Sequence, residues 1–141
     1  RAFRYQLDPL TVLLACAEHP EAVAARLQIP HRHQRWLKAW VQLRDHLAAL
    51  EPGALAQWGA VEWTHWLESQ ADPLHAVPMA LLAGDRARSA LLAWWFRWRH
   101  LDAGLPADAL LEQGWSPGPA LGQELRRRRM ERLAREPRRL R

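Results

Sequence analysis

Residues 85–101, DRARSALLAWWFRWRHL, form the stretch that decides the fold class. Read as an α-helix at about 100° per residue, their large apolar side chains cover roughly 220° of the circumference. An apolar arc of this width is typical of a central helix with neighbours on most sides. Arg97 and His100 face the remaining sector. The side chains in the arc are Leu91, Leu92, Trp94, Trp95, Phe96, Trp98 and Leu101.

Residues that favour helices dominate the rest of the chain. Ala and Leu supply 48 residues, whereas Val, Ile and Thr together supply eight, too few for a sheet. Proline after a capping residue marks helix starts at Asp8-Pro9, Asp72-Pro73 and Ser116-Pro117, and Asp85 marks another. We therefore expect an all-α fold without a sheet. Its about seven to eight helices lie near residues 9–18, 20–28, 31–50, 60–70, 73–83, 85–101, 106–113 and 117–136.

No linker, repeat or low-complexity segment divides the 141 residues, so we expect a single helical domain over residues 1–141. No apolar run approaches the about 18 residues that span a bilayer. The opening RAFRYQLDPL has no apolar signal-peptide core, and it begins with Arg rather than Met. We expect a cytoplasmic chain that makes no membrane contact and is cut from a longer protein.

Cys16 is the single cysteine of the chain and lies in the apolar run TVLLACAEH at residues 11–19. A disulfide framework within one chain is therefore excluded. The apolar surroundings predict a buried, reduced thiol.

The net charge of +5 is unevenly distributed. Residues 125–141 hold nine Arg against Glu131 and Glu136, a net charge of +7 that leaves −2 for the rest of the chain. A localised basic segment of this kind favours an anionic partner, with nucleic acid ahead of a membrane surface. A solubilising tail is the alternative.

Sequence patterns of catalytic and metal sites are missing from this chain. His31 and His33 are two residues apart, so on a helix they point in different directions, and no HxxxH or CxxC spacing occurs. Asp102 and Asp108 are separated by a Gly-Pro loop, unlike the paired carboxylates that hold catalytic Mg²⁺. We expect no catalytic residue, no metal ligand and no cofactor in this chain.

The nine tryptophans have two interpretations. Tryptophan beside arginine, as in WFRWRH, can stack on unpaired bases. Helical wheels favour core packing instead for the residues that share an apolar face, and Trp63 and Trp66 leave the choice open. The core candidates are Trp36, Trp40, Trp94, Trp95 and Trp98.

Residues 114–130, GWSPGPALGQELRRRRM, place a rigid turn before a strongly basic helix. Ser116 or Gly118 can cap this helix, and its free N–H groups would form an anion site. A plain turn between helices is the alternative. Four adjacent arginines span about 300° of a helix, so we expect the helix to leave the core after Leu125.

The segment GLPADALLEQGWSPGPALGQELRRRRMERLARE, residues 104–136, resembles the C-terminal signature of the bacterial tRNA nucleotidyltransferase and poly(A) polymerase family, the CCA-adding enzymes. A weaker likeness lies in EAVAARLQIPHRHQRWLKAW, residues 21–40. Trp115 replaces a usually aliphatic residue, and the arginine run is heavier than in the family. The matching positions are Ala109-Leu110-Leu111, Gly114, Pro117-Gly118-Pro119, Leu121-Gly122 and Leu125.

The resemblance implies a helical body and tail that hold tRNA for a separate catalytic head and neck. The head of such enzymes carries a Gly-Ser motif and paired aspartates and uses Mg²⁺ with ATP and CTP, and this chain lacks both motifs. We therefore expect a parent nucleotidyltransferase that adds nucleotides to RNA 3′ ends. Residues 117–141 would form its basic C-terminal helix and tail.

The leading hypothesis is that this domain binds tRNA or another RNA through the phosphate backbone. The runner-up is a structural domain that packs on the catalytic head or forms a homodimer, with Met130, Leu133 and Ala134 as the docking residues. A helix-turn-helix DNA binder is weaker, because the basic helix carries little Asn or Gln near its start. The residues expected to contact RNA are Arg126, Arg127, Arg128, Arg129, Arg132, Ser116, Gly118, Arg35 and Lys38.

Overall fold

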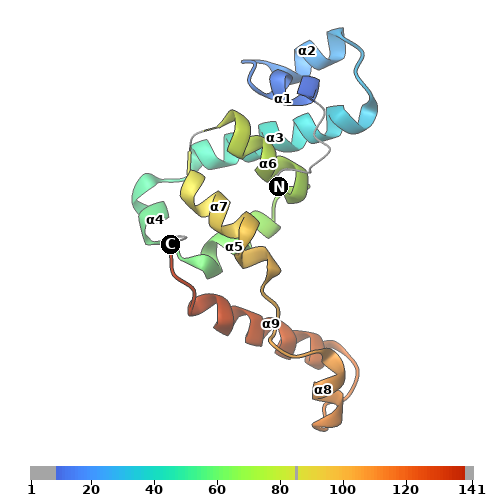
Figure 1. Ribbon diagram of the computed structural model, residues 1–141, viewed down its shortest axis with the longest axis vertical. Coiled ribbons are helices and arrows are strands. Elements are labelled where there is room, and N and C mark those ends of the chain that lie inside the picture. The colour runs from blue at the N-terminus through green and yellow to red at the C-terminus, as the bar shows by residue number, and fades with distance from the viewer. Residues whose placement is uncertain (1–8, 85, 139–141) are drawn as a thin grey trace.

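The central helix that the sequence predicts is present as α7, Arg88–Phe96, and lies among its neighbours in the middle of the molecule (Figure 1). Leu91, Trp94 and Trp95 are buried, and a 3₁₀ turn at Trp98–His100 prolongs the element with Trp98 also buried. The backbone leaves the α-helical region at Arg97, where φ is −131°. Phe96, at the edge of the predicted apolar arc, is 44% exposed.

The computed structural model describes residues 9–84 and 86–138, and over these ranges the fold is all-α, as expected. The predicted helix starts at Asp8 and Asp85 lie outside the described residues. Each predicted helix is present, and one short helix, α4, was not predicted. The helices are α1 (Pro9–Ala15), α2 (Pro20–Arg26), α3 (His31–Ala49), α4 (Pro52–Gln57), α5 (Ala60–Glu68), α6 (Pro73–Ala83), α7, α8 (Ala107–Glu112) and α9 (Pro119–Ala134).

The core of the body lies where α3 packs against α6, with α1 and α2 covering α3 at one end of the molecule (Figure 1). Trp40 is buried, and its indole N–H donates to the Ala15 carbonyl oxygen at 3.0 Å, which fixes the end of α1 on α3. Trp36 is half-buried between two imidazoles, with ring centroids 4.8 Å from His33 and 4.5 Å from His75. The expected core role of the helical tryptophans is confirmed at Trp40, Trp94, Trp95 and Trp98.

Cys16 is exposed, so the prediction of a buried thiol is wrong. α1 ends at Ala15, and its buried side is formed by Thr11, Leu14 and Ala15. Cys16 comes one residue later and falls on the outer side of the turn. Its thiol donates a weak hydrogen bond to the Val12 carbonyl oxygen at 3.5 Å.

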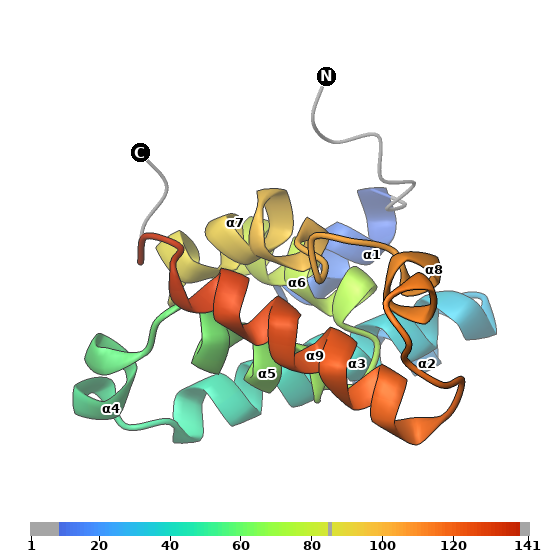
Figure 2. The same ribbon diagram turned by 90° about the horizontal axis from the view of Figure 1, so that it is seen from below.

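The helix after the Pro-Gly-Pro turn does not leave the core, contrary to the expectation from its arginines. α9 lies along α5 (Figure 2), with Leu133 fully buried and Met130 packed against the core. Leu125, Arg129 and Leu133 recur every four residues and so share the face toward the body. Two of the three residues expected to dock on a partner, Met130 and Leu133, therefore pack within this chain.

Candidate nucleic-acid interface

The turn between α8 and α9 is exposed throughout and contains two glycines in the left-handed region. Gly114 and Gly118 have φ of +100° and +144°, a region that favours glycine, and a Cβ at either would meet no atom within 4 Å. Gly118 is the N-cap residue and Pro119 the first residue of α9, so the second of the two predicted caps is confirmed and the helix begins two residues after Pro117. Ser116 and Gly118 are both exposed, which leaves the start of the helix open to an anion.

One side of α9 carries a ladder of ion pairs within the helix. Glu124 accepts hydrogen bonds from Arg127 and Arg128, each with a 2.7 Å contact, and Arg127 also pairs with Glu131. The hydrogen bonds from Arg127 and then Arg128 lower the pKa of Glu124 from its ordinary value of 4.5 to about 2. The same contact with Glu124 raises the pKa of Arg127. The two arginines are thus largely compensated by carboxylates of their own helix.

The inward face of α9 joins the helix to the body through Arg129. Its guanidinium donates to both carboxylate oxygens of Glu68 on α5, at 2.6 and 2.9 Å, and to the Leu101 carbonyl oxygen at 2.8 Å. The side chain is 20% exposed. The hydrogen bond with Glu68 raises the pKa of Arg129, so this cation is held in place by a structural partner.

Arg132 repeats this arrangement one turn later. It donates to the Asp102 carboxylate at 2.8 Å and to the Asp102 carbonyl oxygen at 3.1 Å. Its aliphatic part covers Gly104, where a Cβ would lie 3.3 Å from the Arg132 Cδ. Together, Arg129 and Arg132 attach α9 to the segment that connects α7 with α8.

Arg126 is different, because it is exposed and pairs with no carboxylate among the residues that the structure describes. It lines a groove of about 440 Å³ between α9 and residues 99–107, together with Arg99, Arg129 and Asp102. We call this the Arg126 groove. Three arginines and one aspartate line the groove, so the formal charge of its lining is positive.

Arg99 is a groove residue that the sequence interpretation missed. Its guanidinium carbon lies 4.0 Å from the centroid of a Trp95 ring, and its Nε donates to the Trp95 carbonyl oxygen at 2.6 Å. Trp95 and Arg99 are four residues apart, a spacing at which side chains of one helix meet. That spacing was a usable signal, but the helical wheel assigned the polar sector to Arg97 and His100.

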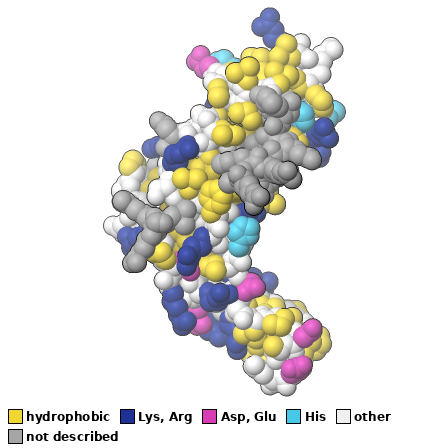
Figure 3. All heavy atoms as spheres, in the orientation of Figure 1, with side chains coloured by type: hydrophobic (Ala, Val, Ile, Leu, Met, Phe, Trp, Pro, Cys, Tyr) yellow, Lys and Arg dark blue, Asp and Glu magenta, His cyan; other side chains and the backbone are white. Residues whose placement is uncertain are grey.

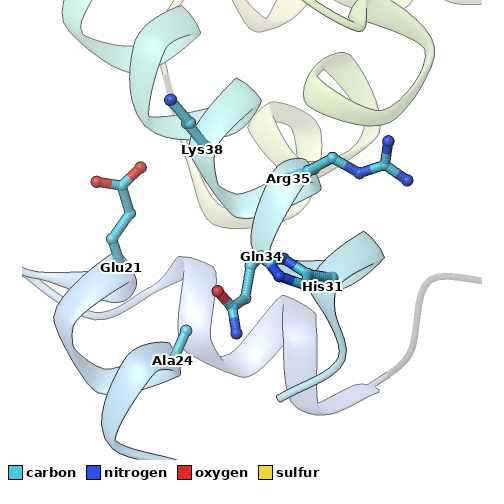
Figure 4. Close-up of a pocket in the computed structure, with 6 residues that line it drawn as sticks. All are labelled: Glu21, Ala24, His31, Gln34, Arg35 and Lys38. Carbon is cyan, nitrogen blue, oxygen red and sulfur yellow. The ribbon is translucent and has the colours of Figure 1, made fainter. Parts of the chain in front are cut away.

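Arg35 and Lys38 lie in another part of the molecule. They line a pocket of about 280 Å³ between α2 and α3, with Glu21, Ala24, His31 and Gln34 (Figure 4). We call this the Lys38 pocket. Lys38 lies on the same side as Glu21, whereas Arg35 extends away from it (Figure 4).

The Arg126 groove and the Lys38 pocket are not brought together, because their elements lie toward opposite ends of the long axis (Figure 1). α3 and α9 run in the same direction (Figures 1 and 2). The outline of the molecule is hollowed between these ends (Figure 3). Arg side chains gather over α9 with carboxylates among them, whereas α8 shows apolar and acidic side chains in this view (Figure 3).

No protein-family model matches the chain, and neither a curated protein nor a solved structure is detectably similar to it. Within residues 9–84 and 86–138, no group of three or more His, Cys, Asp or Glu side chains is placed to hold a metal ion. In the same ranges, none of the helices has the length and apolar character needed to cross a membrane.

Proposed function

We propose that this chain is an RNA-binding helical domain that holds the phosphate backbone of tRNA, or of another RNA, along the Arg126 groove. One observation carries the proposal: Arg126 is exposed, lacks a carboxylate partner in the described part of the chain, and lies in an open groove beside Arg99 and Arg129. Guanidinium groups grip phosphate with two N–H donors, which suits this lining.

A long RNA would also reach the second basic area. The elements of the Lys38 pocket and of the Arg126 groove lie toward opposite ends of the long axis, and the outline of the molecule is hollowed between these ends (Figures 1 and 3). Contacts at both ends would fix the position of a double-stranded arm without reading its sequence, because phosphates carry no base identity. Arg35 and Lys38 thus remain part of the proposed surface.

The finer proposal rests on the resemblance of residues 104–136 to the tRNA nucleotidyltransferase and poly(A) polymerase family. Under it, this chain is the body and tail of a cytoplasmic enzyme whose separate head uses Mg²⁺ with ATP or CTP to extend RNA 3′ ends. The domain itself would carry no catalytic residue and would anchor the RNA for the head.

The ion pairs of α9 indicate which arginines can bind a phosphate without first losing a carboxylate partner. Arg127 and Arg128 must share or give up Glu124 before they bind a phosphate, and Arg129 and Arg132 are held by Glu68 and Asp102. Arg126 carries no such cost. We therefore expect Arg126 to contribute more to RNA affinity than Arg127, although the two residues are adjacent in the run.

The test is tRNA affinity measured as a function of salt concentration. Each phosphate contact that is lost lowers the slope of log K against log salt by about one. We expect Arg126→Gln to lower the slope by about this amount and Arg127→Gln, the matched control with the same charge change, to lower it less. Equal effects of the two variants would contradict the ranking, and no salt-dependent tRNA binding at low salt would contradict the proposed function.

A structural or interaction domain is the second candidate, and the attachment of α9 to the body favours it. Arg129 and Arg132 join α9 to α5 and to the segment before α8, so much of the basic charge has a role within the fold. This candidate predicts no tRNA binding at low salt. It also predicts either a dimer mass in light scattering or a complex with an added catalytic head.

A further inference from the structure

A cavity of about 460 Å³ lies where α4, α5, the start of α7 and the C-terminal segment meet. Figures 1 and 2 both show these elements converging at the side of the molecule away from α8. We call it the Trp58 pocket. Its volume falls within the range of about 300–1,000 Å³ that is common for small-molecule sites.

One wall of the Trp58 pocket is aromatic. Trp58 and Trp63 line it, with ring centroids 5.0 Å apart and ring planes at 78°, an edge-to-face contact. Trp63 is buried and holds the wall from the core side, whereas Trp58 is half-buried. A tryptophan supported in this way offers a rigid surface on which a planar ring can stack.

The other side of the Trp58 pocket is cationic. Arg86 is anchored by one N–H that donates to the Leu47 carbonyl oxygen at 2.9 Å. Arg138 is exposed and has no ion-pair partner among the residues that the structure describes, and Ser89 adds a hydroxyl. The described lining contains no carboxylate, unlike that of the Arg126 groove or the Lys38 pocket.

We propose that the Trp58 pocket binds one nucleotide, with its base against Trp58 and its phosphate between Arg86 and Arg138. An aromatic wall beside two guanidinium groups matches a ligand that carries a flat ring and an anion. The nucleotide is either a free nucleoside monophosphate or one unpaired residue of an RNA strand. This inference is independent of the Arg126 groove and does not require RNA to bind there.

The first experiment measures binding of AMP, ribose 5-phosphate and adenosine to the 141-residue chain by calorimetry. AMP presents both parts of the ligand, so we expect it to bind at least about tenfold more tightly than either fragment, since stacking and charged hydrogen bonds each contribute a factor of this order. AMP that binds no more tightly than ribose 5-phosphate, or that does not bind, would overturn the proposal.

Variants then assign the two parts to residues. Trp58→Leu removes the stacking surface and should weaken AMP binding about fivefold or more, while Trp58→Phe should retain most of the affinity. Arg138 is exposed and forms no ion pair in the described part of the chain, so we expect Arg138→Gln to fold normally. This variant should weaken AMP binding about fivefold without changing adenosine binding. Arg135→Gln, the same change outside the pocket, should leave AMP affinity unaltered.

The source of the nucleotide follows from a comparison of AMP with the single-stranded tetranucleotide of adenosine. In one outcome, the tetranucleotide binds at least tenfold more tightly than AMP, and this difference disappears in Trp58→Leu. That result identifies the ligand as an unpaired residue of an RNA strand. Equal affinity identifies a free nucleotide. Wild-type AMP affinity in both Trp58→Leu and Arg138→Gln would overturn the site, and Arg126→Gln should leave AMP binding unchanged even if it abolishes tRNA binding.

Discussion

The body formed by α3, α6 and α7 packs tryptophan and leucine against one another, whereas α9 is attached to α5 and to the segment before α8 by arginine–carboxylate pairs as well as by apolar contacts. In the body, Leu37, Leu91 and Trp98 are almost fully buried. In α9, Leu121 and Leu133 are buried, and Arg129, between them, reaches Glu68 instead of solvent. Apolar burial responds little to salt, and ion pairs respond to both salt and pH. The two regions should therefore differ in what destabilises them.

The largest effect is expected in the body, from Leu37→Ala. Leu37 is fully buried on α3, and truncation of a buried leucine lowers the free energy of unfolding by about 3 kcal/mol. Denaturant unfolding at low and high salt should give the same loss. Leu13→Ala, at a position that is 69% exposed, is the matched control and should change stability by less than about 0.5 kcal/mol. A similar loss in both variants would mean that the α3 core is not packed as described.

A smaller effect is expected where α9 joins the body. Arg129→Gln leaves Glu68 without its partner and should lower the free energy of unfolding by about 1–2 kcal/mol, between the values typical of exposed and buried pairs. Amide hydrogen exchange should accelerate in α9 more than in α3. In Glu68→Gln combined with Arg129→Gln, the losses should be less than additive. Additive losses would show that the two side chains do not interact in solution.

The smallest effect is a pH dependence of α9. The pKa of Glu124 is lowered in the folded state, from 4.5 to about 2, by hydrogen bonds from Arg127 and Arg128. Its contribution to stability is therefore fully present above about pH 4.5 and is lost as the pH falls from there toward 2. The melting temperature of the wild type should therefore fall over this pH interval. In Glu124→Gln, the melting temperature should fall less over the same interval. A Glu124→Gln variant with the wild-type pH profile would contradict the ladder.

The helices could be predicted from the sequence because apolar residues recur with the helical period and prolines mark the starts. Apolar residues recur every three or four positions in α3, and Pro73 marks the start of α6. α4 was missed because its six residues, PGALAQ, contain no buried side chain and hence no period. Cys16 is exposed because α1 ends at Ala15, three residues before the predicted end at residue 18, and a pattern good to a few residues does not resolve this difference.

The candidate site was less accessible to sequence reasoning. A run of four arginines indicates an affinity for anions. It does not reveal that carboxylates of the same chain pair with most of these arginines. The Glu124–Arg127 and Glu124–Arg128 spacings of three and four residues were visible in the sequence. Glu68, by contrast, is 61 residues from Arg129, and only the packing of α9 on α5 brings them together. That packing distinguishes Arg129 from Arg126, whereas Arg127 and Arg128 are distinguished by pairs within α9.

Exposure of Cys16 has a practical consequence for experiments on this molecule. The chain has one cysteine, and it lies at the end of α1, at the opposite end of the long axis from α8 (Figure 1). A maleimide dye or spin label would therefore attach at a single known point, far from the Arg126 groove. The same thiol can also join two copies through a disulfide when reductant is omitted, so a dimer mass is meaningful only when it persists in reducing buffer.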